Sequence, residues 1–335
     1  MKIIVPMAGM GKRMRPHTLT VPKPLVPIAG KPIVEILVHD IAAASSEKID
    51  EVAFIIGRNF GEEVEAKLKN IAKNIDAKAS IYYQDEALGT AHAIQCAKDS
   101  LKGKVFVAFA DTLFKADFKI DEANDGVIFV QKIENPAAFG VIKLSENNVI
   151  TDFVEKPTTF VSDLAIIGIY YFKDGENLSK ELQYLMDNDI KDKGEFQLTN
   201  AMENMKNKGL QLVPGKVEEW LDCGNKDATV YTNQRILSFK PDASSKGNNI
   251  QNKNSLIIEP SYIGDNVVIS NSIVGPYASI GDGTVISDSI VRNSIIQTNT
   301  KINKNLVENS MVGNFVELDG KFKDLSVGDY NKIKA

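Results

Sequence analysis

The sequence predicts an α/β domain built on a mostly parallel mixed sheet, followed by a left-handed parallel β-helix of hexapeptide repeats. In the first two thirds of the chain, short β-rich runs alternate with amphipathic helical stretches, which is typical of a parallel sheet covered by helices. A polar stretch rich in turn formers follows at 240–249. Beyond it, similar short segments recur, which indicates a repeat architecture.

The elements of the first part follow from periodicity. Pro32 is a favourable first residue for a helix, and the apolar positions between 33 and 41 share one face of it. Apolar residues from Val64 to Ile75, three and four apart, mark a second helix. A third runs from about Thr199 to a C-terminal stop at Gly209, and a fourth follows Gly224. Apolar runs predict strands at 3–5, 52–56, 105–110, 127–130 and 166–172.

The repeats in the last third place aliphatic residues at sixfold-like intervals, with Gly-Asp or Gly-Asn corners between them. The segment 262–269 is echoed at 279–286 and again at 311–316. This pattern resembles the hexapeptide repeats of a left-handed parallel β-helix. A plain β-sandwich is the alternative. We expect a first domain at 1–239, a linker at 240–254, and a β-helix domain with a C-terminal tail at 255–335.

Composition limits the kinds of function. The chain has 335 residues, 43% of them hydrophobic, and a formal net charge of -5. Nucleic-acid binding usually needs a basic face, so this balance argues against it. We find no leader peptide and no apolar run near the ~20 residues that span a bilayer, and therefore expect a cytoplasmic protein with no membrane partner. Cys96 and Cys223 are too few for a disulfide framework or a cysteine zinc site.

A glycine-rich turn and several cations follow the first strand directly. Gly9 and Gly11 allow a sharp turn in which several backbone N–H groups approach an anion. Arg13, Arg15 and Lys23 can add charge-assisted hydrogen bonds. The pattern predicts a phosphate site, although an ordinary strand-to-helix turn with solvated cations is the alternative.

Two well-known phosphate motifs do not fit this turn. The dinucleotide fingerprint needs a third glycine where Met14 stands, and the P-loop needs Ser or Thr where Arg13 stands.

Two carboxylates are candidate metal ligands. Asp111 comes directly after the apolar run 105–110, so it lies at the carboxyl end of a strand, where open α/β sheets bind ligands. Asp222 is the second candidate. Mg²⁺ accepts a site with few carboxylates because phosphate oxygens complete its octahedron. An Asx turn or a helix cap is the alternative for Asp111 read alone.

Further polar residues suit a base and a sugar phosphate. Gln84 offers both a donor and an acceptor, which fits the edge of a pyrimidine, and Gly89 allows a close backbone approach. Lys156 can hold the phosphate of an acceptor, and Glu155 can accept hydroxyl hydrogens from a sugar. A salt bridge at the end of a strand is the alternative for this pair. Small residues around Gly140 suit a sugar pocket.

The ordered set of motifs resembles the sugar-phosphate nucleotidyltransferases of the glucose-1-phosphate thymidylyltransferase and uridylyltransferase type, over nearly all of residues 1 to 240. The matching motifs are Gly9-Met10-Gly11-Lys12-Arg13, Pro22-Lys23-Pro24-Leu25, Gln84 with Leu88-Gly89-Thr90-Ala91, Asp111, Gly140, Glu155-Lys156-Pro157, Gly194-Glu195-Phe196-Gln197-Leu198-Thr199 and Trp220-Leu221-Asp222-x-Gly224.

The resemblance implies a Rossmann-like nucleotidyltransferase domain that joins dTTP or UTP to glucose 1-phosphate, releasing pyrophosphate. By similarity, Arg13 and Lys23 stabilise the triphosphate and the transition state, and Lys156 orients the attacking phosphate. Asp111 and Asp222 hold Mg²⁺. The implied nucleotide-binding residues are Ala8, Gly9, Gly11, Lys12, Arg13, Gln84, Gly89 and Thr90; the implied sugar-phosphate-binding residues are Gly140, Glu155, Lys156 and Ile166.

The substrates stay open at this point. Thymine and uracil differ by one methyl group, which the sequence does not resolve. Ile166 stands where many relatives carry Asn or another residue that contacts the sugar. The alternatives are an N-acetylglucosamine-1-phosphate uridylyltransferase, a mannose-1-phosphate guanylyltransferase, and a catalytically silent regulatory subunit that binds nucleotide sugars.

The histidines bear on the role of the β-helix. Acyltransferases on such a helix generally rely on a histidine base, yet His17, His39 and His92 all fall in the first domain. We therefore expect an assembly and packing module, and a homo-oligomer, because flat aliphatic faces favour self-association. His92 is interpreted as a packed or capped helix residue.

Overall fold

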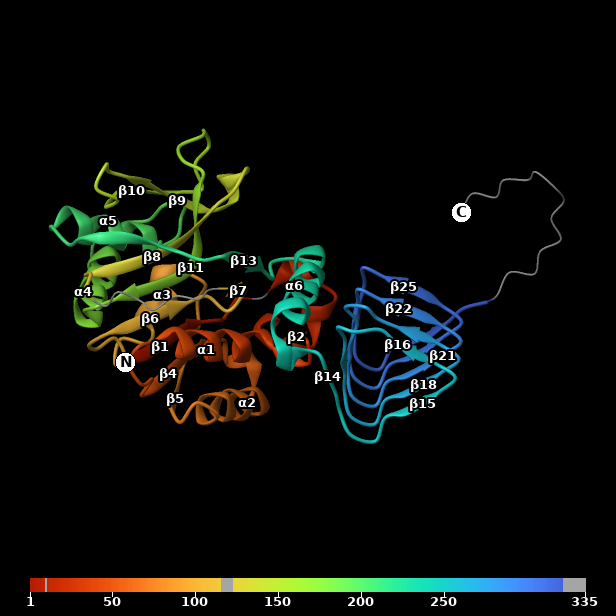
Figure 1. The fold of residues 1–335 in the computed structure, drawn as a ribbon. Coiled ribbons are helices and arrows are strands. Elements are labelled where there is room, and N and C mark those ends of the chain that lie inside the picture. Colours follow the sequence, from red (N-terminus) through yellow and green to blue (C-terminus); the bar gives the residue numbers. More distant parts are fainter. Residues whose placement is uncertain (10, 116–122, 322–335) are drawn as a thin grey trace. The chain divides into compact units, whose positions relative to one another are not determined.

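A computed structural model describes residues 1–9, 11–115 and 123–321 (Figure 1). The chain divides into two compact units. The first comprises Met1–Val26 and Lys31–Ala228, and the second comprises Pro27–Gly30 and Thr229–Ala335. Within the described ranges, no helix is long and apolar enough to cross a membrane.

The first unit is built on one mixed sheet of nine strands. Its main order is β10-β9-β11-β6-β1-β4-β5, and β8 joins β11 to β12. The central strands β6, β1, β4 and β5 run parallel, whereas β11 is antiparallel to β6 and β8. The bounds are β1 (Lys2–Pro6), β4 (Glu51–Ile56), β5 (Lys78–Tyr83), β6 (Val105–Ala108), β8 (Gly126–Lys132), β9 (Gly140–Leu144), β10 (Ile150–Glu155), β11 (Leu164–Phe172) and β12 (Leu212–Lys216). This arrangement confirms the predicted Rossmann-like sheet.

Helices and short connections complete this unit. The helices are α1 (Ile33–Ala44), α2 (Glu62–Lys73), α3 (Thr90–Gln95), α4 (Gly175–Asp187) and α5 (Leu198–Asn207), and α6 (Lys226–Phe239) continues into the second unit. The short strands of this unit are β3 (Lys31–Pro32), β7 (Thr112–Lys115) and β13 (Glu219–Asp222), whereas β2 (Pro27–Ile28) belongs to the second unit. Strand β1 buries Ile3, Ile4 and Val5 completely, as expected for a central parallel strand covered on both faces.

The second unit carries three parallel sheets. Their orders are β14-β17-β20-β23-β26, β15-β18-β21-β24-β27 and β16-β19-β22-β25 (Figure 1). The strands are β14 (Ser245–Lys246), β15 (Gln251–Lys253), β16 (Leu256–Ile257), β17 (Tyr262–Ile263), β18 (Val268–Ser270), β19 (Ile273–Val274), β20 (Ser279–Ile280), β21 (Val285–Ser287), β22 (Ile290–Arg292), β23 (Ile295–Ile296), β24 (Lys301–Asn303), β25 (Leu306–Glu308), β26 (Met311–Val312) and β27 (Glu317–Asp319). Three parallel sheets wound in this order fit the predicted left-handed β-helix.

The coils of the β-helix are shorter than three hexapeptides. Asn249 bonds Asn266 across 17 positions, whereas Asn293 bonds Asn309 across 16. All four asparagines have a positive φ, which Asn tolerates better than most residues. Their stacked side chains therefore stabilise the corners. The predicted domain boundaries remain a prediction; within 240–254, β14 and β15 already pair with β17 and β18.

Candidate active site

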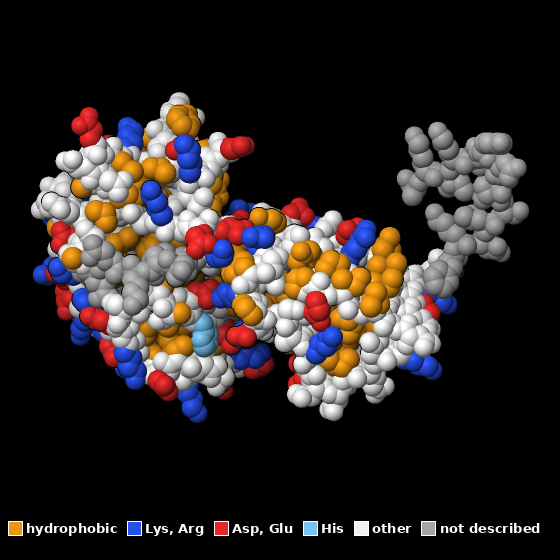
Figure 2. Space-filling view, viewed as in Figure 1, with side chains coloured by type: hydrophobic (Ala, Val, Ile, Leu, Met, Phe, Trp, Pro, Cys, Tyr) orange, Lys and Arg blue, Asp and Glu red, His pale blue; other side chains and the backbone are white. Residues whose placement is uncertain are grey.

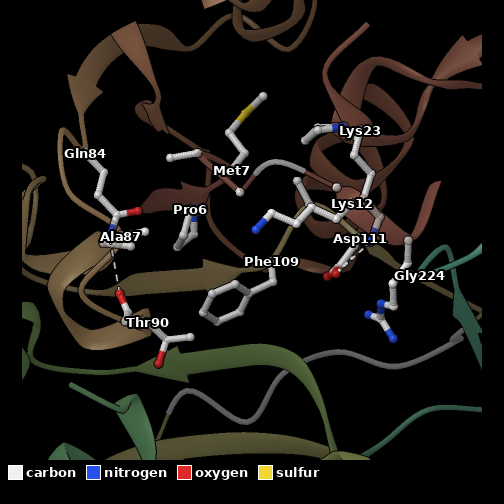
Figure 3. Close-up of a pocket in the computed structure, with 18 of the residues that line it drawn as sticks. Pro6, Met7, Lys12, Lys23, Gln84, Ala87, Thr90, Phe109, Asp111 and Gly224 are labelled. Atoms are coloured by element: carbon white, nitrogen blue, oxygen red, sulfur yellow. Dashed lines mark hydrogen bonds and ion pairs between the residues drawn. The ribbon is translucent and has the colours of Figure 1, made fainter. Parts of the chain in front are cut away.

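A cavity of about 540 Å³ opens at the carboxyl ends of β1, β5 and β6 (Figure 3). Parallel strands end at the same edge of a sheet, so the segments that follow them meet there. The volume is in the range of small-molecule sites. The predicted residues that line the cavity are Ala8, Gly9, Gly11, Lys12, Arg13, Lys23, Gln84, Gly89, Thr90 and Asp111. Met10 lies outside the described residues.

The glycine turn brings two cationic segments together. Gly11 has φ +57, and a Cβ there would lie 2.9 Å from the Cβ of Lys23. The Thr18 hydroxyl donates to the Gly11 carbonyl over 2.8 Å, which fixes the turn. The Arg13 side chain lies close to Gly224, since a Cβ on Gly224 would lie 3.2 Å from the Arg13 guanidinium. Glycine at positions 11 and 224 therefore lets the Lys23 and Arg13 segments pack closely.

Lys23 and Asp111 form an ion pair on one wall of the cavity. The Lys23 Nζ lies 2.9 Å from Asp111 Oδ2, and the Lys23 side chain is only 10% exposed (Figure 3). Lys23 lies in a 3-10 turn, Lys23–Leu25, whose backbone holds the stem of the side chain in the interior. A buried ammonium beside a carboxylate is well placed to meet an anionic ligand.

Asp222 reaches Asp111 through an antiparallel strand pair. Strand β13 pairs with β7, which places Asp222 opposite Thr112, and the Cys223 N–H donates to the Asp111 carbonyl over 2.9 Å. Burial raises the pKa of Asp222, and the negative charge of Asp111 raises it further. The cations Lys23 and Arg13 only partly oppose this shift.

This pair of carboxylates fits a hard divalent cation. A bound cation would offset both the cost of burying the ionised Asp222 carboxylate and its repulsion from Asp111. Among the residues that the structure describes, no group of three or more His, Cys, Asp and Glu side chains could hold a metal. Asp111 and Asp222 would therefore need oxygens from phosphate and water to complete a shell, which is the way Mg²⁺ is usually bound.

Gln84 and Gly89 form the opposite wall. The backbone N–H of Gln84 extends the sheet by donating to Ile56 over 2.9 Å. Its side-chain Nε2 lies 3.3 Å from the Gly89 carbonyl and 3.1 Å from His92 Nδ1. The Thr90 hydroxyl is already hydrogen-bonded within the protein. It donates to Gln197 Oε1 over 3.0 Å and accepts the N–H of Leu198 over 2.9 Å.

The predicted sugar-phosphate residues gather in a second cluster. Gly140 lies directly opposite Glu155 in the β9–β10 pair. A Cβ on Gly140 would lie 3.0 Å from Glu155 Oε2, 3.3 Å from Ile166 and 3.4 Å from Thr199. Glu155 Oε2 also accepts the Thr199 hydroxyl over 3.4 Å. These residues do not line the cavity described above.

Lys156 has an unusual backbone conformation beside this cluster. Its φ is +42, a left-handed value that is uncommon for a residue other than glycine. Lys193 donates to the Lys156 carbonyl over 2.8 Å, which holds the strained residue. The ammonium of Lys156 is half exposed and lies 3.6 Å from Glu155.

Three aromatic side chains of this unit are buried or in mutual contact. Burial raises the pKa of Tyr170, and the negative charges of Glu155 and Asp111 raise it further. Phe139 and Trp220 meet edge to face at 4.9 Å. The buried indole N–H of Trp220 has no hydrogen-bond partner among the described residues, which is unusual for a buried donor.

Several residues of the site were not predicted. Phe109 and Glu195 line the cavity, and Thr199 contacts Glu155. Glu195 and Thr199 belong to the motif 194–199, and that motif was the signal in the sequence that could have identified them. His92 was interpreted as a packed or capped residue, and its ring contacts Gln84. Nothing in the spacing of these two residues marks that contact.

Comparisons with known proteins found a matching family model and several relatives. The nucleotidyl transferase family model matches residues 2–238. The low-salt glycan biosynthesis nucleotidyltransferase Agl11 of Haloferax volcanii is 30% identical over 250 residues, covering 72% of this chain and 67% of that protein. The bifunctional protein GlmU of Methanococcus vannielii is 29% identical and covers 77% of this chain, but the match spans only 61% of GlmU.

A solved structure shares the fold. The crystal structure of UDP-glucose pyrophosphorylase complexed with UDP-glucose matches with a TM-score of 0.59 and 23% identity, covering 71% of this chain and 98% of that chain.

Proposed function

The chain belongs to the nucleotidyl transferase family, and we propose that it is a sugar-1-phosphate nucleotidyltransferase using dTTP or UTP, with glucose 1-phosphate as the first candidate acceptor. One observation carries the proposal: Arg13, Lys23, Asp111 and Asp222 converge at the carboxyl edge of the sheet, beside a cavity that Gln84 closes on the other side. Two cations and two carboxylates around one cavity suit a triphosphate with a divalent cation.

The proposed reaction exchanges one phosphoanhydride bond for another. A phosphate oxygen of the sugar 1-phosphate attacks the α-phosphorus, the bond from that phosphorus to the β-phosphate oxygen breaks, and pyrophosphate leaves. No protein nucleophile is needed, because alignment and charge stabilisation account for most of the catalysis in such transfers.

The residues would share this work by position. Gly9 and Gly11 give the triphosphate close access to backbone N–H groups. Arg13 and Lys23 would neutralise charge that builds on the leaving pyrophosphate and on the α-phosphate. Asp111 and Asp222 would hold Mg²⁺, which supplies charge neutralisation at the reacting phosphates.

The sugar phosphate would use the second cluster. Lys156 presents a half-exposed ammonium to a phosphate, while Glu155, which is 13% exposed, can accept hydroxyl hydrogens. Gly140 leaves room for a ligand beside Glu155, and the buried side chain of Ile166 packs beneath it.

A matrix of triphosphates against sugar 1-phosphates, followed by released pyrophosphate, tests the proposal. dTTP, UTP and GTP are paired with glucose, N-acetylglucosamine and mannose 1-phosphates, since the relatives include GlmU and the mannose-1-phosphate guanylyltransferase catalytic subunit beta of Drosophila melanogaster. Asp111→Asn and Arg13→Ala should abolish turnover. Arg15→Ala is the control, because Arg15, although predicted beside Arg13 as a phosphate-binding cation, does not line the cavity.

Two outcomes decide against the proposal. Turnover that survives both substitutions places the chemistry elsewhere. Nucleotide-sugar binding without pyrophosphate from any pair instead supports the catalytically silent regulatory subunit.

Self-association of this protein is also part of the proposal. On β16, β19, β22 and β25, four aliphatic side chains lie in register and form a stripe, 37 to 67% exposed: Leu256, Ile273, Ile290 and Leu306. Figure 2 shows hydrophobic side chains gathered on this part of the β-helix. A contiguous apolar stripe of this kind favours a homo-oligomer.

A further inference from the structure

The carboxamide of Gln84 is held in one orientation. Its nitrogen faces the Gly89 carbonyl at 3.3 Å and His92 Nδ1 at 3.1 Å. A carbonyl oxygen can only accept a hydrogen bond, so the amide nitrogen, and not the amide oxygen, must point at Gly89. The nitrogen has two hydrogens, and these two acceptors use both of them.

The Gly89 carbonyl cannot turn away from Gln84. Gly89 has φ +115, and its neighbours are clamped to Phe196 by two hydrogen bonds: Phe196 N–H donates to Leu88 at 2.8 Å, and Ala91 N–H donates to the Phe196 carbonyl at 2.9 Å. The Ala93 N–H also donates to the Gly89 carbonyl, over 3.1 Å. The acceptor that fixes Gln84 is therefore part of a rigid backbone.

The same geometry sets the tautomer of His92. Because the Gln84 amide nitrogen only donates, Nδ1 of His92 must be its unprotonated, accepting nitrogen, and the ring proton lies on Nε2. His92 follows Gly89 by three residues at the start of α3, so one short segment supplies both acceptors.

The amide oxygen of Gln84 is then left for the cavity. No residue in the described part of the chain donates to this oxygen, and Gln84 lines the cavity (Figure 3). Resting on the proposed function, we propose that His92 is a positioning residue that locks Gln84 as a hydrogen-bond acceptor toward the base, so that the site selects uracil or thymine over cytosine.

The chemistry of the bases explains this selectivity. Uracil and thymine carry a ring N3–H, which an amide oxygen can accept. Cytosine carries an unprotonated N3, so two acceptors would face each other without a proton between them. Cytosine could bind only if the amide turned over, which would cost the hydrogen bonds to both Gly89 and His92.

Binding constants for UTP and CTP test the lock directly. They are measured by calorimetry without sugar phosphate for the wild type, for His92→Leu, which has no acceptor, and for His92→Asn, whose amide oxygen can replace Nδ1. His39→Leu and His39→Asn are matched controls, because His39 lies in α1 and does not line the cavity.

We expect the preference for UTP over CTP to fall about five- to tenfold in His92→Leu, the worth of one hydrogen bond, and to recover in His92→Asn. In turnover with UTP, KM should rise and kcat should stay within about twofold, since His92 acts through the bound base. A His92→Leu preference equal to that of the wild type overturns the proposal, as does a His92→Asn variant no better than His92→Leu.

Two further readouts separate the possible failures. In ¹⁵N-histidine NMR, His92 should show the tautomer protonated on Nε2, and a ring protonated on Nδ1 contradicts the lock. If UTP binds with the expected preference but no sugar phosphate releases pyrophosphate, the proposed function fails while the His92 comparison still stands. If the wild type binds neither nucleotide, both proposals fall.

Discussion

Replacing Gly89 by alanine tests the clamp that shapes the base-binding wall. Gly89 has φ +115 and ψ 178, a region that is essentially limited to glycine and that costs another residue about 1–3 kcal/mol. An alanine Cβ would also lie 2.4 Å from the Phe196 carbonyl oxygen and 2.7 Å from its nitrogen. These are backbone atoms, so no side-chain rotation can relieve the contact.

The contact can be relieved only by separating the two backbone segments. That separation breaks the hydrogen bonds of Phe196 to Leu88 and of Ala91 to Phe196, each worth about 0.5–1.5 kcal/mol. Together with the backbone strain, Gly89→Ala should therefore lower the free energy of unfolding by about 2–6 kcal/mol. KM for the nucleotide should rise as well, because the Gly89 carbonyl would no longer hold Gln84.

Gly61→Ala is the matched control. Gly61 has φ +80 and ψ 168, a similar conformation, but a Cβ there meets nothing within 4 Å. Gly61→Ala should lower the free energy of unfolding only by the backbone strain of about 1–3 kcal/mol and leave KM unchanged. Urea unfolding followed by tryptophan fluorescence reports on the first unit, which contains Gly61, Gly89 and Trp220, the chain's one tryptophan. Equal losses in the two variants, with KM unchanged in both, would refute the reasoning.

Three more substitutions probe other parts of the molecule. In the absence of metal, Asp222→Asn should gain stability relative to the wild type as pH rises above 3.8, because burial raises the pKa of Asp222 and disfavours only its ionised form. Urea unfolding from about pH 4 to 8 in chelator measures this difference in the free energy of unfolding. A difference that does not change with pH contradicts the prediction. Lys156→Met should raise KM for the sugar phosphate about tenfold or more and leave nucleotide affinity unchanged, which separate titrations of the two substrates measure. Ile273→Lys together with Ile290→Lys should convert an oligomer to a smaller species in light scattering after size exclusion, and an unchanged mass excludes the aliphatic stripe from the interface.

The edge of the parallel sheet was the part of the site that the sequence could predict. Asp111 follows β6 and Gln84 follows β5, and parallel strands bring whatever follows them to one edge. Local order in the chain was therefore enough to place these residues near the glycine turn. The same holds for β1, β4, β6, β8 and β11, each of which overlaps a predicted apolar run, whereas the more polar β9, β10 and β12 were not predicted.

Contacts made through antiparallel pairing were beyond this reasoning. Asp222 meets Asp111 only because β13 pairs with β7 in one particular register, and no periodicity specifies which short strands pair or how. Sequence reasoning named both carboxylates as candidate metal ligands, but it could not derive the strand pairing that brings them together. The His92 ring was missed for a similar reason: its role depends on the direction of one ring nitrogen, which no residue pattern encodes.

Left-handed backbone conformations occur in both units, but different contacts hold them. In the β-helix, positive φ values recur at corners such as Asn249, Asn266 and Asn293, where asparagine accepts the conformation and bonds to the next coil. Lys156 in the first unit and Lys304 in the β-helix adopt the same conformation, so a positive φ at a lysine does not by itself indicate function. Lys156 is distinguished by its surroundings: its carbonyl accepts a hydrogen bond from a second lysine, Lys193, and its ammonium lies 3.6 Å from Glu155, in the cluster that we propose for the sugar phosphate, where a left-handed residue held from outside would fix the direction of the ammonium.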